Sequence, residues 1–309
     1  MQRQLSPSDK SSVSQQVPGN VEDAYLKCES LARTHYENFS LGTWFLPSSL
    51  KRHLFAIYAF CRGVDDLGDQ ANGNRLLLLD EWERQLTLCY RGVPGHPYFV
   101  ALQQTIHRFD IPKTPFLKLI EANRRDQTIK RYRNYRMLLD YCDHSANPVG
   151  HLVLYVLGHR GPELQALSDN TSTALQLTNF WQDISRDFAM DRVYLPEEEM
   201  VRFGVTEHDL GKSRATPELR DLIRFQVNRS QILFTRGLPL VNHLSKFARV
   251  DVALFTAGGM SILRTIERQR YDVLAHRPTL SKWGKGKLLA SVVIRSWLGI
   301  SAIRSDFGN

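Results

Sequence analysis

The chain has 309 residues and is 42% hydrophobic, which is enough for a buried core in one large domain or two average ones. Its 40 Lys and Arg against 32 Asp and Glu give a formal charge of +8, which favours anionic partners without choosing among phosphates, nucleic acid and acidic membrane surfaces. No stretch offers 18 or more apolar residues, and the four cysteines include no C-x-x-C pair. A membrane-spanning helix, a metal-thiolate site and a disulfide framework are therefore not expected.

Residues 1–19 are polar and rich in Ser and Gln, without the apolar core of a secretory signal. We expect a disordered tail there, one all-helical domain over 20–303, a short tail over 304–309, and a cytoplasmic protein.

From residue 20 onward the sequence indicates one helix after another, with no convincing alternation of the kind that strands show. Ser48 or Ser49 is expected to cap the second helix, Pro148 to interrupt the path before the seventh, and Pro239 to kink the ninth. An extended segment is expected over 192–196. Helices are predicted over 21–36, 48–70, 75–90, 98–109, 114–132, 134–146, 150–157, 163–187, 217–246, 249–276 and 284–302.

The first of two acidic clusters follows a strongly apolar run. In a helix, Tyr58, Arg62, Asp65 and Asp69 fall within roughly 40° of one direction, whereas Asp66 lies about 80° away. An arginine beside carboxylates on one helix face can be a plain intrahelical ion pair, worth about 0.3–0.5 kcal/mol. For this cluster alone, that interpretation is the simpler one.

The second acidic cluster extends a polar stripe along the 163–187 helix. Gln176, Asn179, Asp183 and Asp187 share one face of it. Like charges four residues apart destabilise a helix by about 0.2–0.5 kcal/mol, and a polar track in an apolar helix is costly unless it is hydrated, paired or metal-loaded. Two such acidic stripes on two buried helices suggest a shared cation.

Magnesium fits these ligands. It takes oxygen donors, keeps several waters, and is typically held by one or two carboxylates together with substrate phosphates. Zinc or copper would want His or Cys near these positions, and none is there. The stripes therefore indicate Mg²⁺ and a phosphorylated substrate.

A magnesium-bridged diphosphate also needs basic partners, which arginine supplies through paired hydrogen bonds. Arg62 lies on the acidic face, and Arg192 and Tyr194 follow Asp187 closely enough to close over the same site. A basic run surrounds Asp126, and its alternative interpretation is a solvated helix face. The run consists of Arg124, Arg125, Lys130, Arg131 and Arg133.

Three segments together resemble the squalene/phytoene synthase family: residues 58–69, 176–187 and 192–196. The resemblance extends over roughly residues 20–280. Further segments are most similar to the bacterial hydroxysqualene synthases of hopanoid-type squalene biosynthesis. They are 35–39 with Gly42 and 46–47, 145–150, and the Asn-Phe-Trp-Gln form of the second acidic motif.

The resemblance implies a single-domain isoprenoid synthase bundle of helices around a central cavity, in which two aspartate motifs face each other and bind a diphosphate through Mg²⁺. The metal-binding residues that it implies are Asp65, Asp69, Asn179, Asp183 and Asp187. We take the four aspartates and Tyr58 as catalytic. The diphosphate-binding candidates are Arg62, Asn179, Gln176, Asp126, Arg192 and Tyr194.

The implied reaction is the ionisation of presqualene diphosphate, followed by capture of the rearranged cation by water to give hydroxysqualene and diphosphate. Asn147 or Gln176 is expected to hold that water, and Phe180 to border the cavity, whereas Trp181 is expected to be packing. Phytoene-forming enzymes usually show Val-Ala-Gly where this chain has Ser-Ala-Asn-Pro at 145–148.

Two alternatives stay open. One is a condensing enzyme that converts farnesyl diphosphate to presqualene diphosphate, squalene or dehydrosqualene, or a phytoene synthase. The other is a non-catalytic helical protein that binds polyanions through its basic face. Two acidic stripes oppose the latter because they would repel a nucleic-acid backbone, so nucleic acid is not an expected partner.

Two further partners are expected, namely other enzymes of squalene synthesis and the inner face of the cytoplasmic membrane. The C-terminal stretch carries Trp283 and Trp297 among basic and aliphatic residues. It either lies on an anionic membrane or packs as a final helix.

Overall fold

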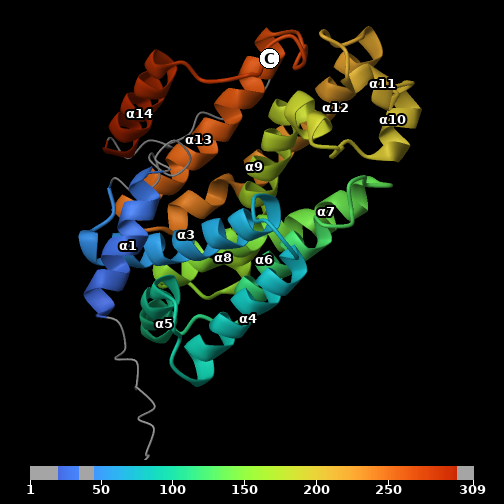
Figure 1. Cartoon of the computed structure of the whole chain (residues 1–309). Coiled ribbons are helices and arrows are strands. Elements are labelled where there is room, and N and C mark those ends of the chain that lie inside the picture. The colour runs from blue at the N-terminus through green and yellow to red at the C-terminus, as the bar shows by residue number, and fades with distance from the viewer. Residues whose placement is uncertain (1–19, 35–44, 298–309) are drawn as a thin grey trace, which may run out of the picture.

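The computed structural model describes residues 20–34 and 45–297, and over these ranges the chain forms helices joined by turns and short loops (Figure 1). The predicted all-α class is confirmed. The β pairing within these ranges is one isolated bridge between Arg131 and Val193. The predicted tails at 1–19 and 304–309 and the motif at 35–42 lie outside the described residues.

The helices agree with the predicted ranges to within a few residues at most boundaries. In chain order they are α1 (Val21–Thr34), α3 (Ser48–Asp69), α4 (Arg75–Arg91), α5 (Pro97–Phe109), α6 (Thr114–Arg125), α7 (Tyr135–Ser145), α8 (Asn147–Val156), α9 (Pro162–Ala189), α10 (Glu197–Phe203), α11 (Glu207–Leu210), α12 (Pro217–Gly237), the 3₁₀ helix η1 (Leu238–His243), α13 (Lys246–Arg268) and α14 (Lys282–Trp297).

Helix α9 runs through the middle of the bundle and packs against α7, α8, α12 and α13 (Figure 1). Its apolar face includes Leu177 and Trp181, both fully buried. The Trp181 indole Nε1 donates a hydrogen bond to Ser230 Oγ of α12 at 3.0 Å. Trp181 is therefore packing, as predicted, and the polar stripe of α9 is left to face the opposite direction.

Helix α3 is fixed in a similar way by its aromatic face. Phe60 is 1% exposed and meets Phe99 and Phe116 edge to face, at centroid distances of 5.9 and 5.0 Å. Such contacts add about 0.5–1.5 kcal/mol each beyond area burial. Because this face is locked against α5 and α6, the acidic side chains at the end of α3 have a defined direction.

The predicted serine cap of α3 was wrong. Pro47 occupies the N-cap position, and no side chain makes a capping hydrogen bond. Instead, the Pro47 carbonyl accepts hydrogen bonds from the amides of Leu50 and Lys51, at 2.9 and 3.0 Å. The extended conformation that proline enforces sets the start of this helix without a hydroxyl.

The helix predicted over 114–132 ends early, at Arg125. The residues after it turn to meet the extended segment that follows α9. The amides of Val193 and Glu197 donate to the carbonyls of Lys130 and Tyr132, each at 2.9 Å. These partners come from far along the chain, so local periodicity gave no sign of them.

The predicted proline breaks are confirmed. Helix α7 ends at Ser145, and α8 begins at Asn147 with Pro148 in its first turn. The long segment predicted over 217–246 divides at Gly237, after which Pro239 lies in the first turn of η1. The short helices α10 and α11 were missed. Within the described residues, no helix combines the length and apolar character needed to cross a bilayer.

Candidate active site

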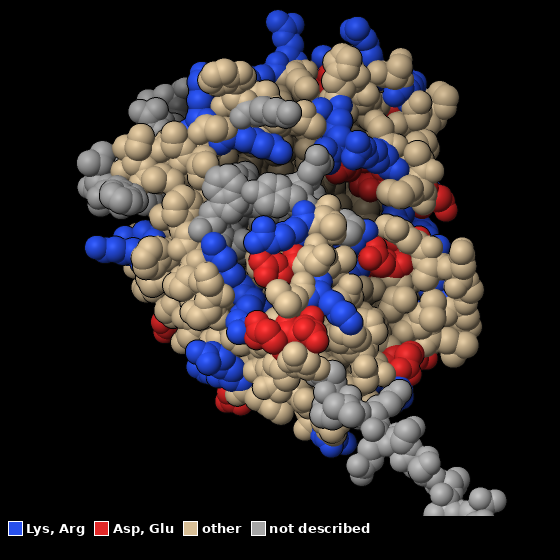
Figure 2. All heavy atoms as spheres, turned by 60° about the vertical axis from the view of Figure 1, so that its left-hand side comes forward, with Lys and Arg blue, Asp and Glu red and all other residues tan. Residues whose placement is uncertain are grey.

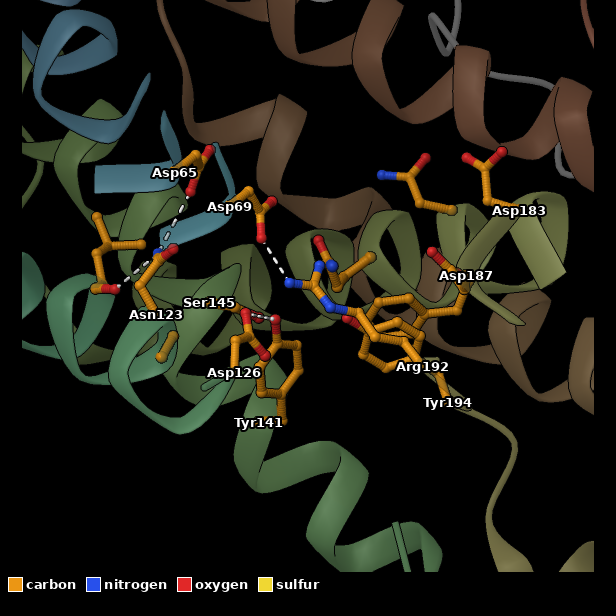
Figure 3. Close-up of a pocket in the computed structure, with 15 residues that line it drawn as sticks. Asp65, Asp69, Asn123, Asp126, Tyr141, Ser145, Asp183, Asp187, Arg192 and Tyr194 are labelled. Carbon is orange, nitrogen blue, oxygen red and sulfur yellow. Dashed lines mark hydrogen bonds and ion pairs between the residues drawn. The ribbon is translucent and has the colours of Figure 1, made fainter. Parts of the chain in front are cut away.

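A pocket of about 290 Å³ lies between α3, α6, α7, α9 and the extended segment after α9 (Figure 3). Its walls are dominated by carboxylate, amide and hydroxyl groups. The lining residues are Asp65, Asp69, Leu119, Ala122, Asn123, Asp126, Tyr141, Ser145, Gln176, Asn179, Phe180, Asp183, Asp187, Arg192 and Tyr194.

The structure brings most of the predicted site residues together in this pocket. Asp65 and Asp69 come from α3 and face Asp183 and Asp187 of α9, with Arg192 between the two pairs (Figure 3). The pocket is also lined by five further residues that the sequence analysis placed at the site: Asp126, Gln176, Asn179, Phe180 and Tyr194. Two aspartate-bearing helices that are distant in sequence thus share one space.

Tyr58 and Arg62 are not among the lining residues. The Arg62 guanidinium pairs with Asp66 Oδ1 at 2.6 Å along the same helix. An intrahelical ion pair was the simpler interpretation of this cluster, but the partner of Arg62 is Asp66 and not a carboxylate of the predicted face. Burial raises the pKa of Tyr58.

Asp65 is held by an amide on the neighbouring helix. Asn123 Nδ2 of α6 donates to Asp65 Oδ1 at 3.3 Å. Burial raises the pKa of Asp65 to about 6, although the Asn123 hydrogen bond opposes the shift. The approach of Asn123 depends on Gly68, where an added Cβ would lie 2.3 Å from Asn123 Oδ1. The glycine of the acidic motif therefore makes room for the residue that orients its first carboxylate.

A buried carboxyl group, Asp126, faces the pocket from the C-terminal end of α6. The Tyr141 hydroxyl of α7 donates to Asp126 Oδ2 at 2.9 Å. Burial raises the pKa of Asp126 to about 6, an effect that the hydrogen bond and Arg192 reduce. Near neutral pH this group carries a charge that is stabilised by one hydroxyl and one guanidinium.

Arg192 connects the two sides of the pocket. Its Nη2 atom lies 2.5 Å from Asp69 Oδ1, and its side chain is 16% exposed. Its backbone amide donates to the carbonyl of Asp187 at 2.8 Å, which fixes the start of the extended segment. Further along, Tyr194 stacks on Phe180 with ring centroids 3.8 Å apart and an interplanar angle of 7°. This aromatic pair forms a wall beside the acidic groups.

Helix α9 is distorted at Asp183, whose φ and ψ are −109° and 15°. Its carboxylate accepts two hydrogen bonds from Arg277, at 2.5 and 2.8 Å. One turn later, burial and the Asp183 charge raise the pKa of Asp187 to about 7, against the effect of Arg192. Arg277 was missed at the sequence level because it lies between α13 and α14, far from either acidic motif.

Part of the predicted basic run does not serve this pocket. Arg124 pairs with Asp80 and Glu83, at 2.5 and 2.8 Å. Arg131 pairs with Asp191 and Glu207, both at 2.7 Å. These arginines join helices and loops to one another, so they match neither the predicted role in diphosphate binding nor the alternative of a solvated helix face.

Across the described part of the chain, no group of three or more His, Cys, Asp and Glu side chains is placed to hold one ion by itself. The carboxylates are instead divided between two walls of the pocket.

The family model for squalene/phytoene synthase matches residues 32–284 of this chain. The chain belongs to the squalene/phytoene synthase family. Two curated members show the breadth of the match. The phytoene synthase of Arthrospira platensis is 31% identical over 91% of this chain and 96% of its own length. The 15-cis-phytoene synthase of Synechococcus elongatus is 31% identical over 90% of this chain and 94% of its own length.

Solved structures of squalene/phytoene synthases share the fold. Squalene synthase HpnC from Alicyclobacillus acidocaldarius is 44% identical, with a TM-score of 0.79, over 82% of this chain and 97% of that chain. A dehydrosqualene synthase in complex with ligand is 27% identical, with a TM-score of 0.83, over 90% of this chain and 98% of that chain. The protein is therefore a squalene/phytoene synthase-type enzyme, a head-to-head prenyl synthase in the broad sense.

Replacing Gly68 with alanine tests the contact that orients Asp65. The added methyl group forces Asn123 away, and overpacking of this kind typically costs about 1–3 kcal/mol. We expect Gly68→Ala to lower the thermal unfolding midpoint and to reduce turnover. Gly95→Ala is the matched control, because an added Cβ there meets no atom within 4 Å. Equal activity of the two variants would contradict this role for Gly68.

Proposed function

We propose that this enzyme is a Mg²⁺-dependent hydroxysqualene synthase, which ionises presqualene diphosphate and captures the rearranged cation with water. The observation that carries the proposal is the pair of aspartate groups facing each other across one pocket with Arg192 between them. Membership of the squalene/phytoene synthase family and the 44% identity to squalene synthase HpnC support a substrate of squalene biosynthesis.

The donor set of the pocket fits magnesium. Asp65 and Asp69 would hold it from α3, and Asn179, Asp183 and Asp187 from α9, all through oxygen. Bound there, Mg²⁺ would neutralise the diphosphate and so stabilise its departure. Carboxylates on two separate walls leave room between them for waters and phosphate oxygens.

The chain's own cations would bind the remaining diphosphate charge. Arg192 already lies inside the pocket, and its guanidinium donors suit phosphate oxygens as well as they suit the Asp69 carboxylate. Donors fixed in place before the reaction stabilise developing charge at little reorganisation cost. Beside them, an outer ring face of the stacked Phe180–Tyr194 pair would stabilise a carbocation, by about 2 kcal/mol when desolvated.

A separate apolar cavity of about 260 Å³ lies between α3, α8, α9, η1 and α13. Ser172 and Leu175 of α9 line this cavity, and Gln176 lines the acidic pocket. Ser172 and Gln176 are one turn apart, about 6 Å along the helix axis. A diphosphate held by the aspartates would thus direct its hydrocarbon chains into a space that excludes water.

Of the two residues predicted to hold the capturing water, Gln176 lines the acidic pocket and Asn147 does not. The Asn147 Oδ1 atom accepts a hydrogen bond from the buried Thr173 hydroxyl at 2.9 Å. This contact joins the start of α8 to α9, so we assign Asn147 to structure. Ser145 does reach the pocket, and its hydroxyl has no hydrogen-bond partner within the described residues.

Condensation of farnesyl diphosphate is the second candidate function. It is favoured by the likeness to a dehydrosqualene synthase at 27% identity and to phytoene synthases at 31%. The same acidic pocket would bind the diphosphate of farnesyl diphosphate in that reaction.

We also propose that the enzyme stays in the cytoplasm, works beside other enzymes of squalene synthesis and touches the inner face of the cytoplasmic membrane through α14. Trp283 on this helix is 83% exposed, and Lys285 and Lys287 are exposed next to it. Basic side chains are spread over the face shown in Figure 2, with acidic ones among them near its middle. Aromatic and basic groups together suit an anionic lipid surface, into which a C30 product would pass.

Metal removal tests the proposed role of the aspartates. Chelation with EDTA should abolish diphosphate release, and added Mg²⁺ should restore it. Asp69→Asn should lower kcat/KM by about 100-fold or more, since one lost stabilising group commonly costs that much. Asp66→Asn is the matched control, because Asp66 is on the same helix but outside the pocket. Full activity of Asp69→Asn would contradict the assignment.

Product analysis decides between the two functions. Purified enzyme with Mg²⁺ and without NADPH receives presqualene diphosphate or farnesyl diphosphate in separate reactions. We expect hydroxysqualene from presqualene diphosphate alone, with label incorporated from H₂¹⁸O. A cyclopropyl or C30 hydrocarbon product from farnesyl diphosphate would instead establish the condensing function.

Vesicle sedimentation tests the membrane contact. Binding should be stronger to phosphatidylglycerol vesicles than to phosphatidylcholine vesicles and should weaken as salt rises, because the attraction is electrostatic. Trp283→Ala combined with Lys285→Glu should reduce it. Equal binding of wild type and variant would rule out α14 as the contact.

A further inference from the structure

The apolar cavity beyond the acidic pocket contains one ionisable group, Asp251 of α13, among the described residues that line it. Most of the other lining side chains are Leu, Val, Ala and Phe from α3, α8, α9, η1 and α13. The remaining polar groups are the hydroxyls of Ser168, Thr171 and Ser172 on α9. A carboxyl group in such surroundings calls for a physical explanation.

Asp251 is 2% exposed, and neither of its carboxyl oxygens has a hydrogen-bond partner within the described residues. The backbone N–H groups of Phe45 and Leu46 and the charge of Lys51 favour its charged form. Burial outweighs them and raises the pKa of Asp251 to about 7. An unsatisfied buried polar group typically costs about 1–3 kcal/mol, and more when it is charged.

The position of Asp251 relates it to the reaction. Because the cavity begins one turn of α9 from the acidic pocket, a hydrocarbon attached to the bound diphosphate would extend toward α13. After the carbon–oxygen bond breaks, the cation would lie in this cavity. A water molecule there needs two to four polar partners. Asp251 and the α9 hydroxyls are the described side chains that could supply them.

Resting on the function proposed above, we infer that Asp251 is the catalytic base that holds the capturing water and accepts its proton. The water oxygen donates a lone pair to the cationic carbon and forms the C–O bond. One O–H bond of the water breaks, and its proton passes to a carboxylate oxygen of Asp251. The products are an alcohol and a neutral carboxylic acid, which returns its proton to solvent before the next turnover.

This assignment explains why no side chain of the described residues hydrogen-bonds the carboxyl group. A carboxylate already saturated by protein donors would bind water weakly and accept a proton poorly. Its pKa near 7 lets it hold and release a proton close to neutral pH. The apolar wall would keep further waters from competing for the cation.

The test compares Asp251→Asn and Asp251→Leu with the wild-type enzyme on presqualene diphosphate and Mg²⁺. Both variants should release diphosphate within about threefold of the wild-type rate, because ionisation occurs in the other pocket. The ratio of alcohol to C30 hydrocarbon should fall at least about tenfold, since the lost base contributes at least that much to water capture. Asp251→Glu should retain part of the alcohol.

Asp169→Asn is the matched control, because Asp169 pairs with His151 at 2.7 Å and does not line either cavity. Its alcohol ratio should equal that of the wild type. Thermal unfolding gives a second readout. Removing an unsatisfied buried carboxyl should leave the unfolding midpoint of Asp251→Leu equal or higher, whereas a structural role would lower it.

Each outcome is decisive. An unchanged alcohol ratio in both Asp251 variants would overturn the inference, while wild-type alcohol formation would leave the proposed function standing. Destabilised variants that lose diphosphate release would also overturn it, because Asp251 would then be structural. If the wild type forms no alcohol from presqualene diphosphate, the proposed function itself fails, and the role of Asp251 fails with it.

Discussion

Mutual repulsion among carboxylates is the constraint on which this site depends. Asp65 and Asp69 on α3 face Asp183 and Asp187 on α9 inside one partly enclosed pocket. Loss of hydration raises the pKa of Asp65 and Asp187, and the neighbouring Asp69 and Asp183 charges add to the shift. Arg192 offsets part of it by direct pairing with Asp69. A bound cation would offset the remaining repulsion between the aspartates. We therefore propose that this space holds a metal ion and the diphosphate that it binds.

The helical bundle supplies the rigidity that such a site requires. On α3 and α9, large aromatic side chains are packed on one face, so the acidic groups on the other face cannot turn away from each other. Phe60 and Trp181 have this role. Burial of apolar side chains on the opposite faces of α3 and α9 is favourable, and it offsets the repulsion between the aspartates.

The interior is divided into a polar and an apolar part along α9. Its polar stripe passes from Asp183 through Gln176 to Ser172, and the character of the cavity changes between the last two. A charged leaving group and a hydrocarbon chain need opposite surroundings, and one helix provides both within a few turns. Asp251 is a buried ionisable side chain in the apolar part. A buried group that lowers stability is a good candidate for a functional role.

The fold class, most helix positions and the faces that carry Asp65, Asp69, Asp183 and Asp187 could be predicted from the sequence, because helical periodicity is local and places residues four apart on one side. The proline breaks were predictable because a proline ring removes a hydrogen-bond donor and clashes within its own turn of helix, which is also a local effect.

The partners that meet those faces could not be predicted from the sequence, because they depend on how distant segments pack. Asn123, Tyr141 and Arg277 contact site carboxylates from helices and loops that are distant in sequence. Asn147, a plausible water ligand by its polarity, is instead bound to Thr173. Asp251 sits in an ordinary amphipathic helix and shows no local motif. Four other helical segments surround Asp251. Whether a polar group finds a partner depends on how such segments pack, and no single stretch of sequence shows that.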